Sequence, residues 1–297
     1  MKKFIIATLL LPGFIHSSAF AQELEPVQQP KKLSFLKDMA DDIDNFLSGD
    51  DEIVTGPNET RLVLGQRLVW EEGGMWDYSI DADLRLHLPK FAEKWRLRFT
   101  TYDTDEEEVG LKKSQARTQE RTEDAGLSIF FLSQFKTIQI TFRPRLNGDG
   151  VSHVLRFKRP SDFWMFKFKP KLELFARPDE GTGQFLALNM GYHINHSWLF
   201  TLINEEQYTD IDNTMATNQG FAFRHIHDEN TTQYYALIFE SSNQPHYRLD
   251  KYTLSTTYEH YFKDRTMVYR LIPSIIWARV NEFEGNPVMT FEFDYIF

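Results

Sequence analysis

The stretch Trp76–Leu88, with the sequence WDYSIDADLRLHL, decides the fold of this chain. Apolar and polar side chains alternate strictly along it. The apolar set is Trp76, Tyr78, Ile80, Ala82, Leu84, Leu86 and Leu88, and the polar set is Asp77, Ser79, Asp81, Asp83, Arg85 and His87. Because successive side chains of a β-strand point to opposite faces, the stretch predicts a strand with one wholly apolar face. At ~3.3 Å per residue that face is roughly 20 Å tall before tilt, which suits membrane hydrocarbon.

The same two-residue period continues from Thr60 to the last residue. It predicts strands at 60–70, 76–88, 94–103, 125–133, 136–145, 151–159, 163–176, 184–194, 197–206, 217–227, 231–241, 250–262, 266–279 and 287–297. Fourteen is even, as closure of a bacterial barrel requires. The alternation is weakest in 125–145 and 217–241, so twelve strands remain an alternative. The sequence therefore predicts an all-β, antiparallel, up-and-down transmembrane barrel.

Composition agrees with alternating strands and excludes several classes of protein. Aromatic residues make up 15% of the chain, yet the mean hydropathy is −0.45. No apolar stretch of helix-spanning length follows the N-terminal segment, which excludes a helical membrane protein. The chain has no cysteine, which excludes thiol catalysis and cysteine metal sites. We expect no metal and no cofactor.

The N-terminal segment 1–21 has the features of a cleaved export signal. Lys2 and Lys3 precede a short apolar run, and Ala19-Phe20-Ala21 matches the small-x-small pattern before a cleavage site. Cleavage leaves 31 of the 33 basic residues against 43 acidic residues. The resulting net charge of −12 argues against nucleic acid as a partner.

Residues 22–58 are predicted to form a periplasmic tether followed by a short helix, before a barrel domain at 59–297. Gln22–Lys32 holds two prolines, and the apolar spacing of Leu33–Leu47 suits an amphipathic helix. Three alternatives remain for this helix, which are a helix at the periplasmic rim, a plug in the lumen, and disorder.

The lengths of the predicted connections suggest an orientation. If the N-terminus is periplasmic, the inner connections are short, as at Pro160–Asp162, and most outer ones are longer, as at Thr104–Asp124. This asymmetry is typical of outer-membrane barrels. It places both termini of the barrel in the periplasm.

The six tryptophans lie at predicted strand ends on the apolar face. Indole rings prefer the membrane interface, where the ring is apolar but the N–H finds water. The predicted interface residues are Trp70, Trp76 and Trp277 at the outer rim, and Trp95, Trp164 and Trp198 at the periplasmic rim.

The last strand adds a resemblance to a known class. Met289, Phe291, Phe293, Tyr295 and Phe297 alternate with polar residues, and the sequence stops at Phe297. This resembles the C-terminal strand of Gram-negative outer-membrane proteins, in which the barrel assembly machinery reads the final aromatic. The resemblance implies an outer-membrane barrel in contact with lipid and lipopolysaccharide. It selects no family within that class.

Charged residues on the polar faces are predicted to form two opposite walls of the lumen. The basic wall is Arg96, Arg98, Arg143, Arg156, Lys158, Lys167, Lys169 and Lys171. The acidic wall is Asp77, Asp81, Asp83, Glu259, Glu292 and Asp294. A transverse field of this kind selects polar solutes, because charge near a low-dielectric wall is poorly screened.

These walls favour a monomeric barrel with a narrow passage for small hydrophilic, anionic solutes. One alternative is a sealed structural or assembly barrel that binds partners through its loops or N-terminal helix. Another is an outer-membrane hydrolase, for which His193 and the pair His246 and Asp250 are the best candidates. None of these histidines has a nucleophile in a suitable pattern, so no catalytic residue is predicted.

Overall fold

The computed structural model describes residues 60–74, 76–87, 95–102, 123–135, 137–159, 161–163, 166–178, 180–262 and 265–297. The predicted signal segment, tether and helix lie outside these residues, as does most of the connection after Tyr102. No helix in the described ranges is both long enough and apolar enough to cross a membrane.

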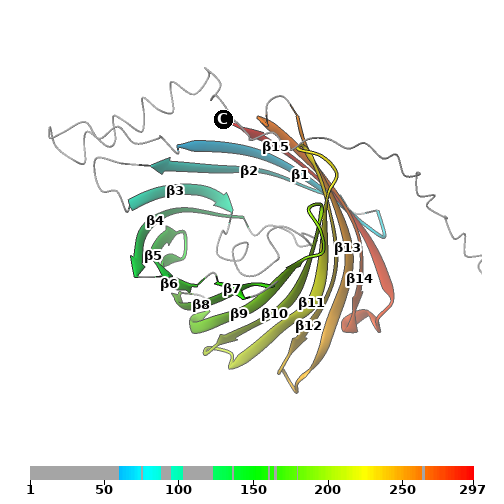
Figure 1. Ribbon diagram of the computed structural model, residues 1–297. Coiled ribbons are helices and arrows are strands. Elements are labelled where there is room, and N and C mark those ends of the chain that lie inside the picture. The colour runs from blue at the N-terminus through cyan, green and yellow to red at the C-terminus, as the bar shows by residue number, and fades with distance from the viewer. Residues whose placement is uncertain are drawn as a thin grey trace, which may run out of the picture. The chain divides into compact units, whose positions relative to one another are not determined.

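The described residues form one antiparallel sheet closed into a barrel (Figure 1). Its strands are β1 (Arg61–Glu71), β2 (Trp76–His87), β3 (Trp95–Tyr102), β4 (Glu123–Phe135), β5 (Ile138–Asn147), β6 (Gly150–Lys158), β7 (Ser161–Phe163), β8 (Phe166–Arg177), β9 (Gly181–His193), β10 (Trp198–Thr209), β11 (Thr214–Ile226), β12 (Thr231–Ser242), β13 (Arg248–Phe262), β14 (Met267–Ala278) and β15 (Gly285–Ile296). Because β7 is a three-residue extension beside β8, the wall has fourteen strands, which confirms the prediction.

The first and last strands close the barrel. β1 pairs with β15 from Val63 opposite Ile296 to Glu71 opposite Val288. The Phe297 N–H also donates to the Leu62 carbonyl at 2.8 Å. On the other side of the ring β6 pairs with β8. Closure gives each of the fourteen strands of the wall, with β7 counted as the continuation of β6, a neighbour on both sides. A sheet surrounded by lipid requires this, because lipid cannot hydrogen-bond to an open edge.

The wall exposes apolar side chains on its outside and polar side chains line its inside, which is the reverse of a soluble barrel. On β2, Tyr78 and Ile80 are 55% and 65% exposed, whereas Asp81 and Asp83 are only 6% and 4% exposed. The other strands likewise present apolar side chains outward, as the exposed Phe142, Leu254 and Phe291 illustrate. An outer wall of this kind suits contact with lipid.

The pairing of β6 corrects the predicted turn at Pro160–Asp162. β6 pairs with β8 as far as Lys158 opposite Lys171, and pairing resumes at β7 with Ser161 opposite Phe168. Between them the Arg159 N–H donates to the Pro170 carbonyl, but Pro170 has no N–H to return. The proline interrupts the ladder without ending it, so pairing continues to Phe163 opposite Phe166.

Several strands are longer than the sequence predicted, at the end of the barrel that lies away from the two chain termini. We call the end where β1 begins and β15 ends the terminal end, and the opposite one the far end. β9, β11 and β13 begin at Gly181, Thr214 and Arg248, which leaves short far-end connections such as 210–213 and 243–247. Apart from the segment between β3 and β4, the predicted difference in length between the two ends is therefore largely absent.

One far-end turn is fastened to its neighbouring strand by a carboxylate. Asp210 accepts hydrogen bonds from the Thr182 backbone N–H at 2.7 Å and from the Thr182 hydroxyl at 2.6 Å. The hydroxyl hydrogen bond is the main cause that lowers the pKa of Asp210 below its usual value. This contribution to stability is present above the unfolded pKa of about 3.9 and is lost as pH falls through the lower folded value.

We therefore expect the protection of the Thr182 amide against hydrogen exchange to stay constant down to about pH 4 and to fall below it. The measurement is the protection factor of Thr182 in micelles across this range. The Asn243 N–H, which donates to the Met215 carbonyl in the next turn, serves as the control amide. Constant protection of Thr182 to pH 2.5 would contradict the role given to Asp210.

Candidate functional site in the lumen

The inward face of the barrel holds the predicted basic residues on a limited set of strands. Arg98, Arg143 and Arg156 are buried, at 4%, 2% and 8% exposure. Lys158 and Lys171 lie opposite each other on β6 and β8. Lys167, Lys169 and Arg96 are exposed. β5, β6 and β8 are consecutive in the wall, while β3, which bears Arg96 and Arg98, is separated from β5 by β4.

The predicted acidic residues fall into two separate groups. Asp77, Asp81 and Asp83 are on β2, directly beside β3, whereas Glu259, Glu292 and Asp294 are on β13 and β15. In the ring of fourteen strands, β13 to β15 lie across from β5 to β8. Only the second group therefore has the opposite position that the two-wall prediction describes.

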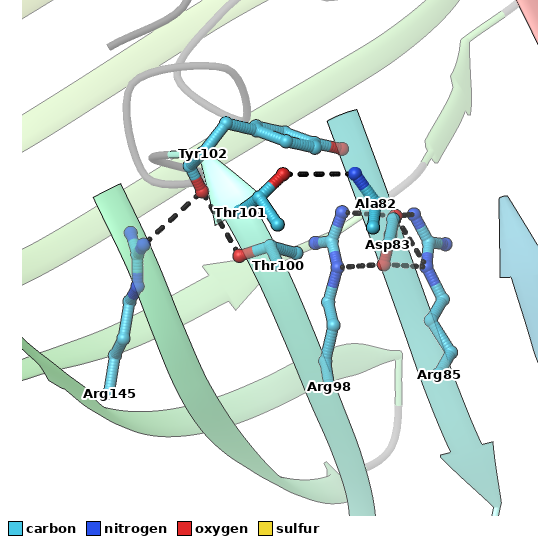
Figure 2. A network of polar contacts seen from close by, with 8 residues as sticks. All are labelled: Ala82, Asp83, Arg85, Arg98, Thr100, Thr101, Tyr102 and Arg145. Carbon is cyan, nitrogen blue, oxygen red and sulfur yellow. Dashed lines mark hydrogen bonds and ion pairs between the residues drawn. The ribbon is translucent and has the colours of Figure 1, made fainter. Parts of the chain in front are cut away.

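Asp83 is clamped between two guanidinium groups (Figure 2). Arg98 on β3 donates to its two carboxylate oxygens at 2.9 and 2.8 Å, and Arg85 donates at distances down to 2.7 Å. Forked arginine–carboxylate pairs are among the strongest hydrogen bonds in proteins. This local group has two positive charges and one negative charge.

The end of β3 is fixed by a bulge beside the same group (Figure 2). The register with β4 shifts between Thr100 and Tyr102, and both side chains are buried. The Tyr102 carbonyl accepts hydrogen bonds from the Thr100 hydroxyl at 3.0 Å and from Arg145 at 3.2 Å. The Arg145 guanidinium lies over Gly126 of β4, where even a methyl group would collide with it. Glycine thus makes room for a buried arginine.

The second acidic group surrounds one arginine that the sequence analysis did not single out. Arg270 on β14 contacts Glu259 at 2.6 Å, Asp294 at 2.6 Å and Glu292 at 3.3 Å. Glu292 is also 3.7 Å from Arg67 on β1. The acidic side of the lumen is therefore largely neutralised by its own arginines.

The basic side is neutralised in part as well. Glu173 on β8 is 1% exposed and contacts Arg156 at 2.6 Å and Lys171 at 3.1 Å. Within the described residues, Lys167 and Lys169 take part in no ion pair. They are the cations of this wall that face water without a described acidic partner.

Two clusters of apolar side chains share the inward face. One is Val154, Phe175, Phe185 and Ala187, and the other is Ile203, Ala222, Ala236 and Ile238. Cations lie over two of the rings, with Lys171 Nζ 4.5 Å from the centroid of Phe185 and Arg177 4.5 Å from that of Phe175. The lumen is therefore polar and charged, but not uniformly so.

Four of the predicted interface tryptophans lie at strand ends on the outward face. Trp70, Trp76 and Trp277 are at the far end, and Trp198 is at the terminal end. Trp198 stacks on His225, with ring centroids 4.2 Å apart. The structure does not describe Trp164 or the side chain of Trp95. Phe297 closes the seam with β1 through its backbone.

The residues considered for catalysis are not brought together. Asp250 is hydrogen-bonded to the Ser242 hydroxyl and to Arg248, not to His246. His193 lies on the inward face of β9 among cations. Among the described residues, no three histidine and carboxylate side chains converge as they do around a metal ion.

Comparisons with known proteins support the fold. No protein-family model and no curated protein matches the chain. Among solved structures, OmpT of Vibrio cholerae with loop L8 deleted, an outer membrane protein, has a TM-score of 0.52 at 8% identity, covering 81% of this chain and 99% of that one. OprB of Pseudomonas putida, in a low-pH structure, has a TM-score of 0.52 at 9% identity, covering 81% and 92%. The chain thus has the fold of outer-membrane β-barrel proteins.

Proposed function

We propose that this barrel resides in the bacterial outer membrane and forms a narrow passage for small hydrophilic, anionic solutes. The observation that carries the proposal is the pair Lys167 and Lys169, which are inward-facing, exposed and without a described ion-pair partner. Inward cations that remain hydrated attract anions, because a low-dielectric wall screens their charge poorly. The barrel fold and its apolar exterior support the location.

The remaining parts of the proposal concern orientation and partners. We infer that the terminal end faces the periplasm and that the barrel functions as a monomer in contact with lipid and lipopolysaccharide. The alternating aromatic residues that end at Phe297 support recognition by the barrel assembly machinery. Protease accessibility of the 210–213 turn in whole cells tests the orientation, since that turn is then extracellular.

Reversing the charge of Lys167, Lys169 and Lys171 to Glu is expected to change the passage from anion-selective to cation-selective. Six units of charge are altered at one stretch of the wall, so the reversal potential in a salt gradient should change sign. The measurement is single-channel recording of the refolded chain in planar bilayers. Reversal of Arg248, at the exposed start of β13, and Arg265, at an exposed turn, is the control and should leave the sign unchanged.

A sealed barrel is the second candidate, and specific observations favour it. Inward-facing Ile203, Ala222 and Ile238 are 2%, 1% and 7% exposed, and most inward charges are paired. Side chains fill the lumen of small barrels, while the largest barrels hold open channels. Absence of conductance from correctly folded protein would favour the sealed barrel, and its loops would then be the binding surface.

A further inference from the structure

A group of three cations and one histidine lies at the terminal end of the lumen, on β8, β9 and β11. Lys167 is opposite Gly191, and Lys169 is opposite Asn189. Leu199 on β10 is opposite both His193 and Arg224. Side chains directly or diagonally opposite on neighbouring strands are within reach of each other. Arg224 is two strands from His193, and its charge still acts on His193 across Leu199. The four are Lys167, Lys169, His193 and Arg224, and we call them the basic mouth.

The basic mouth has few acidic neighbours among the described side chains. The charged side chains whose fields act on His193 are Lys167, Arg224 and Lys169. None of the four forms an ion pair with another described side chain. In the backbone register Asp162 is at the position opposite Lys167. Glu205 on β10 accepts a hydrogen bond from Asn189 at 2.7 Å.

Arg224 adds an unsatisfied donor to this group. Its Nε is buried and donates no hydrogen bond to any described residue. A buried charged donor without an acceptor is costly, so such groups usually mark a place that a water or a ligand fills. Gly191 adds no side chain of its own between Lys167 and His193, and the side chain of Leu199 lies beside it, at contact distance from the place that a methyl group would take.

We propose that the basic mouth binds the phosphate group of a solute. This deepens the proposed function, on which it rests, by naming the class of anion that the passage takes. Two ammonium groups, a guanidinium fork and an imidazole approach from three strands, and they match the several oxygens and double charge of a phosphate better than a planar, singly charged carboxylate.

Binding of inorganic phosphate to the refolded full chain in micelles tests the inference without requiring conduction. The probe is followed by broadening of its phosphorus resonance at constant ionic strength. We expect saturable binding that acetate at equal concentration does not displace. Arg224→Gln should raise the dissociation constant about tenfold, and Arg224→Lys should recover part of the loss.

The matched control is Lys251→Gln, which removes a lumen cation at the far end that is paired with Glu240 at 3.3 Å. It should leave phosphate binding unchanged. If Arg224→Gln does not fold, judged by heat-modifiable migration, His193→Gln and Lys169→Gln decide in its place. Non-saturable binding, or equal weakening by the far-end variant, would overturn the inference.

Further measurements distinguish free phosphate from a phosphate ester as the ligand, and the phosphate site from the proposed passage. Competition by glycerol 3-phosphate at similar concentration assigns the site to phosphate esters, whereas its exclusion assigns the site to free phosphate. Saturable phosphate binding without conductance refutes the passage but retains the site. Anion-selective conductance without saturable phosphate binding refutes the site and retains the passage.

Discussion

Replacing Asp83 by alanine is expected to destabilise the folded barrel by about 3–5 kcal/mol, the usual cost of removing one partner from a buried ion pair. The reason is the burial of Arg98, which is 4% exposed and loses both of its short hydrogen bonds to the carboxylate. Arg85 is more exposed and can turn toward water. The measurement is the free energy of unfolding in urea, with the protein in lipid vesicles.

Asp77→Ala provides the matched control for this prediction. Asp77 is on the same face of β2 and has the same charge, but it is exposed and forms no ion pair with a described residue. Its replacement should change the free energy by less than about 0.5 kcal/mol. Equal effects of the two substitutions would show that the clamp around Asp83 contributes nothing specific.

Replacing Arg270 by alanine is expected to destabilise the folded barrel by a similar amount. Here the carboxylates lose their cation, whereas in the Asp83 variant an arginine loses its carboxylate. It leaves Glu259, Glu292 and Asp294 together without their shared cation, although Arg67 remains 3.7 Å from Glu292. We expect a loss of about 3–5 kcal/mol at pH 8. In the variant the folded state takes up protons more readily than the unfolded state, so the loss should shrink as the pH falls.

The matched control for Arg270 is an arginine paired with a carboxylate near water. Arg248 is 3.3 Å from Asp250, and the side chains of the two are 42% and 36% exposed. Exposed pairs of this kind contribute at most about 1 kcal/mol, so Arg248→Ala should have little effect at either pH. A loss for Arg270→Ala that is independent of pH would argue against repulsion among the three carboxylates.

The wall of the barrel was predictable because alternation depends only on local sequence. The period in Trp76–Leu88 identifies both faces of β2, and the same rule gave the number of strands. The continuation of β6 into β7 was not predictable from that rule. It depends on Pro170 of the neighbouring strand, which interrupts the ladder at one point and permits pairing on both sides of it.

The candidate site was predictable in part. Alternation identifies the residues that face inward, and it also places Arg270 on the inward face of the strand predicted at 266–279. It does not give the register between strands, and register decides which charges meet. Asp83 was assigned to an acidic wall, but pairing of β2 with β3 brings it to Arg98. The basic mouth likewise depends on which residues of β9 and β11 lie opposite Leu199.

The seam between β1 and β15 has a consequence for the order of events during assembly. Leu62 and Phe297 exchange backbone hydrogen bonds although almost the whole barrel sequence lies between them. Contacts between such distant segments form slowly, because a very long loop must close first. Until the final strand pairs with the first, the growing sheet has two open edges whose backbone N–H and C=O groups lack partners, and lipid offers them no hydrogen bonds. Assembly of the barrel must therefore shield both open edges from the acyl chains until β1 and β15 pair.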